Sequence, residues 1–222
     1  MKNTETIISE TKAEQIYHRI KASILKGEIL PGEKLVIHQL AEHFKTSAIP
    51  VREALGRLEA GNLVTVIPHT GVYVKEMDLE CLRELYPLRG VLEGYAVRLA
   101  VEKIRPNDLA KLKELIQEMD NAGSDKDYAL MGRLNIEFHR TIYTASGNMT
   151  LINMINGLWE KTSFARLVFK FKPFRAKDSN KEHKMIVEAL ENKNSKRAEK
   201  LIIRQSEKTL QLLNLHLEKK KN

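Results

Sequence analysis

Hydrophobic positions in the first third of the chain recur at the spacing of short amphipathic helices. Ile16, Ile20, Ile24 and Leu25 share one helical face, which predicts a helix over about 12–27. Two further helical patterns follow in "VIHQLAEHFK" and "TSAIPVREALGRLEAGNLV". The next segment, "LVTVIPHTGVYVKEM", is rich in β-branched residues and is broken by "PHTG", which predicts two strands around a turn. Three helices and a β-hairpin describe a winged helix-turn-helix.

The remainder of the chain shows only helical spacing, interrupted by helix-ending stretches such as "NAGSDKD", "KPF" and "NKNS". The sequence therefore predicts a mainly α protein with two domains: a DNA-binding winged helix-turn-helix over 9–77 and an all-α domain over 78–222. The helices expected in the second domain span about 78–103, 106–122, 126–146, 148–171, 178–192 and 194–219.

Composition narrows the class of protein. The single cysteine, Cys81, excludes an internal disulfide framework, and no apolar run approaches the roughly 20 residues that cross a membrane. The N-terminus lacks the layout of a secretory signal, so we expect a cytoplasmic protein. The net charge of +8 is uneven, because residues 1–77 hold 10 Lys and Arg against 9 Asp and Glu, and residues 78–222 hold 27 against 20.

The third predicted helix has the features of one that enters a DNA groove. Ser47 is a suitable N-cap, and it places Pro50 in the first turn, where a missing N–H costs nothing. Such helices present their N-terminal residues to phosphates and base edges, and Thr46, Ser47 and Arg52 lie at that end. The alternative is a surface helix with solvated arginines. The inward stripe is predicted to hold Val51, Ala54, Leu55 and Leu58.

The segment "PGEKLVIHQLAEHFKTSAIPVREALGRLEAGNLVTVIPHTGVYV" resembles the signature of the GntR family of bacterial transcription regulators. The resemblance implies that Arg52 contacts the operator and that the residues around Ser47 touch phosphate. It also implies that the turn formed by His69, Thr70 and Gly71 reaches the minor groove.

Two residues depart from that signature, because Ala48 and Ile49 stand where the family has an arginine and a threonine. Ala48 cannot make the bidentate guanine contact of an arginine, which is worth about 1–3 kcal/mol of discrimination. Ile49 can instead pack against a thymine methyl group. We therefore expect an operator that departs from the family's common half-site.

The second segment resembles the FadR-type effector domain, called FCD, in "LRELYPLRGVLEGYAVRLA", "NIEFHRTIYTASGN" and "EHKMIVEAL". The resemblance implies a homodimer whose C-terminal domain binds an effector. Family members place one Asp and three His around a divalent metal in a central cavity. The corresponding positions here are Asn135, His139, His183 and Gln205.

These four residues lie on inward-facing helical stripes, where an unpaired polar group costs on the order of 1–3 kcal/mol. They must bind a metal such as zinc, nickel or manganese, form a polar pocket without metal, or satisfy one another. Two imidazoles and two amides make a weaker metal site than one with a carboxylate, because no anionic ligand offsets the desolvation of the ion.

Arg89 lies one turn before Glu93, and the family resemblance suggests that it faces the cavity and meets a carboxylate. Arg140 and Arg166 are further candidates. We therefore expect an anionic metabolite, such as an organic or sugar acid, as the effector. An apolar face on the same helix suits pairing of two chains on a two-fold operator; it is formed by Leu85, Leu88, Val91 and Leu92.

These observations predict a regulator whose operator affinity changes when the effector favours one conformation over another. The family resemblance implies a repressor, although the sequence itself does not show the direction of regulation. One rival is a metal-dependent enzyme that uses His139 and His183, but no carboxylate beside them can act as general base. A second rival is a non-specific architectural DNA binder. That class would concentrate positive charge in the DNA-binding half, and the charge count above shows the opposite.

Overall fold

The computed structural model describes residues 10–26, 28–76, 79–162 and 173–221. The chain divides into two compact units, Met1–Glu76 and Met77–Asn222. Each unit has its own hydrophobic core and is described by itself.

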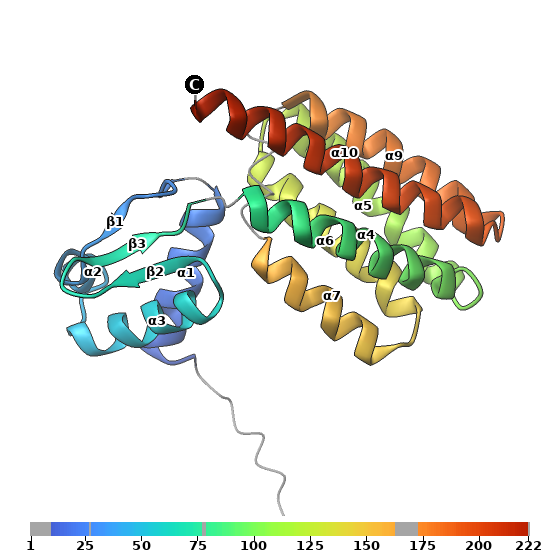
Figure 1. Ribbon diagram of the computed structural model, residues 1–222. Helices are drawn as coiled ribbons and strands as arrows, with labels where there is room; N and C mark the ends of the chain where they lie inside the picture. The colour runs from blue at the N-terminus through green and yellow to red at the C-terminus, as the bar shows by residue number, and fades with distance from the viewer. Residues whose placement is uncertain (1–9, 27, 77–78, 163–172, 222) are drawn as a thin grey trace, which may run out of the picture. The chain divides into compact units, whose positions relative to one another are not determined.

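The first unit is a winged helix-turn-helix, as predicted (Figure 1). Its sheet is antiparallel with strand order β1-β3-β2. The strand β1 was not predicted, because two residues within "PGEKL" are too few to show a period; Leu35 of this strand pairs with Val72. In chain order the elements are α1 (Lys12–Lys26), β1 (Lys34–Leu35), α2 (Ile37–His43), α3 (Ala48–Ala60), β2 (Val64–Ile67) and β3 (Gly71–Val74).

The core of this unit forms where α1 packs against α3. Ile20 and Ile24 of α1 are buried, and so are all four residues of the stripe predicted on α3. Burying such side chains contributes roughly 1.5–3 kcal/mol each. The result is a rigid base that presents the opposite face of α3 to solvent.

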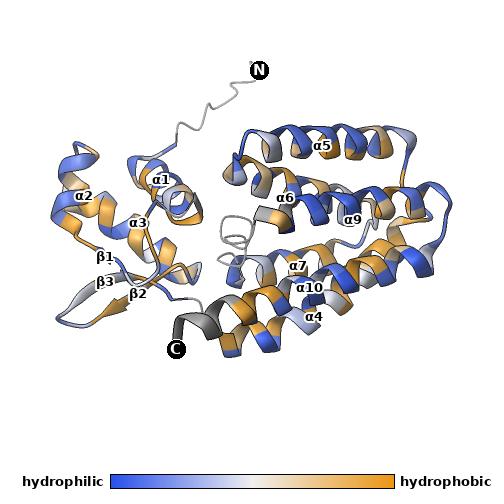
Figure 2. Cartoon of the chain, turned by 90° about the horizontal axis from the view of Figure 1, so that it is seen from above, coloured by the Kyte–Doolittle hydropathy of each residue, from blue (hydrophilic) through white to orange (hydrophobic). Residues whose placement is uncertain are grey.

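The second unit is an all-α bundle in which α10 packs along α4, and α5 lies beside α6 and α9 (Figure 1). Most of its helices carry both hydrophobic and hydrophilic residues along their length (Figure 2), as expected for helices that are buried on one side only. No helix in the described part of the chain is long and apolar enough to cross a membrane. The helices are α4 (Leu79–Ala100), α5 (Pro106–Ser124), α6 (Tyr128–Ala145), α7 (Met149–Lys161), α9 (Pro173–Glu191) and α10 (Ser195–Lys221).

Two helix boundaries differ from the prediction. The helix expected over 148–171 corresponds to α7, which ends at Lys161. Residues 163–171 of the expected helix lie outside the described residues. The helix expected from 178 begins earlier, at Pro173. Proline at the first helical position needs no hydrogen-bond partner for its nitrogen, so "KPF" starts a helix here.

One glycine of α4, Gly94, allows its close approach to α10. A Cβ atom at Gly94 would lie 3.0 Å from Cγ1 of Ile203, and one at Gly90 would lie 3.8 Å from Cβ of Ser206. The first distance is shorter than packed side chains tolerate without a shift of their neighbours. The contact between the two helices therefore depends on the missing side chain at Gly94.

Candidate functional site

The first candidate site is the exposed face at the N-terminal end of α3. Ile49 is 68% exposed, an unusual position for a large apolar side chain. Ser47 is the N-cap residue, but its side chain makes no capping hydrogen bond. Its hydroxyl and the first helical amides therefore remain available to an external acceptor such as a phosphate. Thr46 and Ala48 are half-buried beside them.

The two arginines of α3 differ in their surroundings. Nη1 of Arg57 lies 3.4 Å from Oε1 of Glu14, at the start of α1. Arg52 is exposed and has no ion pair with any described residue. Arg52 can therefore meet an external anion without first breaking an internal contact.

The turn between β2 and β3 projects a second polar surface. His69 and Thr70 are exposed, and His69 and Gly71 have φ values of 62° and 134°. The φ of Gly71 favours glycine, because it strains other residues. The amide of Thr70 donates to the carbonyl of Ile67 at 3.1 Å, which closes a tight turn at the tip of the hairpin.

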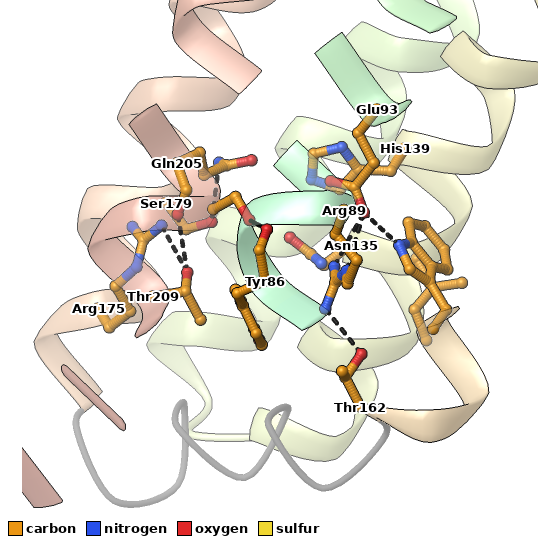
Figure 3. A pocket seen from close by; sticks show the side chains of 13 residues that line it. Tyr86, Arg89, Glu93, Asn135, His139, Thr162, Arg175, Ser179, Gln205 and Thr209 are labelled. Atoms are coloured by element: carbon orange, nitrogen blue, oxygen red, sulfur yellow. Dashed lines mark hydrogen bonds and ion pairs between the residues drawn. The ribbon is translucent and has the colours of Figure 1, made fainter. Parts of the chain in front are cut away.

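The second candidate site is a cavity of about 80 Å³ inside the helical bundle (Figure 3). Four of the residues singled out in the sequence line it, namely Arg89, Asn135, His139 and Gln205. His183 does not line the cavity. It is fully buried next to His139, with ring centroids 5.2 Å apart. Arg140 is exposed, and Arg166 lies outside the described residues.

A buried ion pair forms one wall of this cavity. Nε and Nη2 of Arg89 each lie 3.0 Å from Oε1 of Glu93, and Nη1 donates to Oγ1 of Thr162 at 2.9 Å. The indole of Trp159 donates to the same carboxylate oxygen at 2.6 Å. Burial alone would lower the pKa of Arg89, but Glu93 more than offsets this and raises the pKa above its ordinary value. Arg89 is therefore charged, and the carboxylate of Glu93 balances its charge.

The two buried histidines are neutral near pH 7. Nδ1 of His139 contacts the hydroxyl of Tyr143 at 3.2 Å, and Nδ1 of His183 contacts Oδ1 of Asn180 at 3.4 Å. Burial lowers the pKa of His139 to about 4 and that of His183 well below its ordinary value. Nε2 of His183 is buried and has no hydrogen-bond partner among the described residues.

Arg175, on α9, forms the opposite wall of the cavity and was not singled out in the sequence (Figure 3). It is only 2% exposed. Its Nη2 donates to Oε2 of Glu182 at 2.8 Å and to Oγ1 of Thr209 at 3.4 Å. Nε and Nη1 are buried without a partner in the described part of the chain. These two atoms leave three N–H groups unsatisfied in a residue that lines a cavity.

The sequence did contain a signal for Arg175. Taking "KPF" as a break left Arg175 outside any helix, whereas a start at Pro173 places it four residues before Ser179 on one helical face. Both residues line the cavity. Glu93 and Trp159 are among the other wall residues missed, and their contact depends on long-range packing.

The charges and polar groups of the side chains in and beside the cavity suit an anion better than a divalent cation. His139 and His183 are neutral, Asn135 and Gln205 are amides, and the carboxylate of Glu93 is already paired with Arg89. Two guanidinium groups line the same space. Among the described residues, no group of three or more His, Cys, Asp or Glu side chains is placed to hold a metal ion. A divalent ion would meet net positive charge and no free anionic ligand.

A winged helix-turn-helix joined to an all-α domain with a polar cavity defines a ligand-responsive transcription regulator. A family model described as "Bacterial regulatory proteins, gntR family" matches residues 12–74, and the FCD domain model matches residues 84–206. The chain belongs to the GntR family and carries a C-terminal FCD domain. Members bind operator DNA through the first domain and small-molecule effectors through the second.

Individual relatives agree with this assignment. The transcriptional regulator McbR of Escherichia coli is 37% identical over 145 residues, which are 65% of this chain and just under two thirds (66%) of McbR. A probable D-xylose utilization operon transcriptional repressor of Paenarthrobacter nicotinovorans is 28% identical over 82% of this chain and 79% of its own. These relatives are regulators, so the enzyme alternative has no support.

A solved structure of E. coli McbR/YncC is also similar to this chain. It has a TM-score of 0.78 and 28% identity, with coverage of 96% of this chain and 100% of the other. The likeness extends through both units, in agreement with the two family matches.

The buried histidines predict a loss of stability in acid. An imidazole in the unfolded chain titrates near 6.5, and His139 in the folded chain titrates near 4. Between these values the unfolded state binds a proton that the folded state does not, so the free energy of unfolding falls as the pH drops below 6.5. The expected loss from His139 is about 2 kcal/mol between pH 7 and pH 5.

Urea unfolding near pH 7 and near pH 5 measures this loss. The variant His139→Gln should lose about 2 kcal/mol less than the parent over the same interval. An equal loss in both proteins would contradict a neutral, buried His139.

Proposed function

We propose that this protein is a repressor whose affinity for its operator falls when a small carboxylate binds in the cavity of the second unit. The observation that carries the ligand class is Arg175, a buried guanidinium with three N–H groups unpaired among the described residues. Buried N–H donors without an acceptor are costly. A carboxylate is the ligand that best satisfies such donors.

Repression is supported by the Paenarthrobacter relative, which is named as a probable transcriptional repressor. Contact with the operator is assigned to Ser47, Arg52 and the turn at His69, because these residues are exposed at the end of α3 and the tip of the wing. Ile49 is assigned to a thymine methyl group, since its exposed apolar side chain has no partner in solvent. We also propose a cytoplasmic location, where an operator is accessible.

The carboxylate is proposed to bind directly, without a metal ion. The cavity already supplies positive charge through Arg175, so a metal is not needed to attract an anion. Trp159 is the only tryptophan of the chain and lines the cavity. Its fluorescence therefore reports binding in the intact protein.

The variant Arg175→Met should lose at least about tenfold in carboxylate affinity, because a hydrogen bond to a charged group is worth about 1.5–3 kcal/mol. Trp159 fluorescence titrated with a panel of small carboxylates measures the affinity. Arg140→Met, at an exposed position, is the control and should bind as the parent does.

The same titration after dialysis against a chelator tests the role of a metal. Unchanged affinity is expected for direct binding. A metal ion would hold the ligand if dialysis removes binding and added zinc, manganese or nickel restores it. In that case the metal should fail to restore binding to His139→Ala.

Operator binding should depend on Arg52 more than on Arg57, since Arg57 is paired with Glu14 and Arg52 has no such partner in the described chain. Arg52→Ala should weaken binding by about 1–3 kcal/mol, or roughly fivefold to more than a hundredfold. Fluorescence anisotropy with an operator selected from random DNA by the parent protein measures both variants. Equal losses for Arg52→Ala and Arg57→Ala would refute the assignment.

We further propose that the protein is a homodimer paired through α4. Leu88, Val91 and Tyr95 lie on one face of this helix and are 56%, 64% and 39% exposed, and an apolar patch of this kind marks an interaction surface. Val91→Glu should shift the protein toward monomer in sedimentation velocity and weaken operator binding. Met154→Glu places the same charge on the exposed apolar surface of α7 and should remain dimeric.

A further inference from the structure

We infer that the ligand of the cavity is a monoanion, with its carboxylate on Arg175 and an uncharged, hydroxylated remainder toward Arg89. This inference rests on the proposed function, because it specifies the ligand of the same site. It comes from the charges and the hydrogen-bond directions of the cavity walls (Figure 3).

The wall at Arg89 carries no free charge. Oε1 of Glu93 accepts from Arg89 and from Trp159, so the charge of this carboxylate is paired. Nη1 of Arg89 donates to Oγ1 of Thr162. This pair is therefore neutral as a unit, and it offers a ligand neither a free guanidinium nor a free carboxylate.

The wall at Arg175 carries an excess positive charge. Its counter-ion, Glu182, also accepts from Nζ of Lys208 at 2.7 Å. Burial would raise the pKa of Glu182, but Arg175 and Lys208 lower it, so this carboxylate stays charged. One carboxylate shared between two cations leaves one positive charge uncompensated among the described residues. A single negative charge on the ligand would complete the balance.

Three of the hydroxyl groups that line the cavity, those of Thr162, Ser206 and Thr209, have already committed their protons. Thr162 donates to the carbonyl of Leu158 at 2.8 Å, and Thr209 donates to that of Gln205 at 2.9 Å. Ser206 donates to the carbonyl of Tyr86 at 3.3 Å. Each of these oxygens therefore presents lone pairs to the cavity, and lone pairs require donors on the ligand.

Hydroxyl groups on the ligand meet this requirement, and a second carboxylate does not. A carboxylate only accepts hydrogen bonds, so it would face the lone pairs of these hydroxyls and would find no uncompensated positive charge at the Arg89 wall. A buried carboxylate without donors or a counter-ion is strongly unfavourable. The cavity therefore discriminates between acids that differ in one terminal group.

Matched pairs of acids test this directly, because each pair exchanges one CH₂OH group for a carboxylate. The probes are glycerate and tartronate, threonate and tartrate, and gluconate and glucarate, titrated into the full-length protein and followed by Trp159 fluorescence. The hydroxylated monoanion should bind at least about tenfold more tightly than its dianionic partner. A dianion that binds equally or more tightly would refute this inference while leaving the carboxylate effector in place.

Absence of binding by every acid of the panel would overturn the proposed effector class itself, and the inference with it. The two failures are therefore distinguishable within one experiment.

Two variants check the charge balance from opposite directions. Glu93→Gln removes a negative charge from the Arg89 wall and should narrow or reverse the preference against dianions. In Lys208→Gln, Arg175 is the only cation paired with Glu182. This variant should lower the affinity for the monoanion several-fold, although Lys208 does not line the cavity. Lys200→Gln, at an exposed position on α10, is the matched control and should change neither. An unchanged affinity in Lys208→Gln would refute the shared-counter-ion argument, even if Glu93→Gln fails to fold.

Discussion

The buried ion pair between Arg89 and Glu93 is the interaction around which the second unit is organised. It joins α4 to α7 through Trp159 and Thr162, and it places two charges where water has little access. Removing one partner of such a pair typically costs about 3–5 kcal/mol, because the other is left buried and unpaired. The polar groups buried in the bundle are tolerated because they form hydrogen bonds with one another. Arg175 is an exception, since its Nε and Nη1 have no partner among the described residues, and this points to a ligand.

The two units use arginine in different ways. In the first unit, Arg52 is exposed on a helix whose opposite face is packed into the core, so the scaffold is rigid and the contact residue is free. In the second unit, Arg175 is buried and fixed by Glu182. An exposed arginine suits a large anionic surface that arrives from solvent, and a buried one suits a small molecule that can be enclosed.

The sequence predicted the fold class and the buried stripe of α3, because these depend on local periodicity and on turn residues. The resemblance to the FCD domain implied that Arg89, Asn135, His139 and Gln205 lie at the cavity, and helical spacing agreed that the last three face inward. The sequence-based prediction failed at His183, which is buried beside the cavity, and at Arg175, where a proline was taken as a helix end. Glu93 and Trp159 were not predicted because their contact joins residues far apart in the chain, and no local pattern records such a pairing.

The approach of α4 to α10 at Gly90 and Gly94 has a consequence for the range of ligands in related proteins. These helices carry Arg89 on one side and Gln205, Ser206 and Thr209 on the other, so Gly94 sets the separation between groups that line the cavity. A larger residue at position 94 would push Ile203 outward and widen the space without altering any side chain that lines it. Ligand size can thus diverge within such a family through helix spacing alone, while the chemistry of the pocket stays constant.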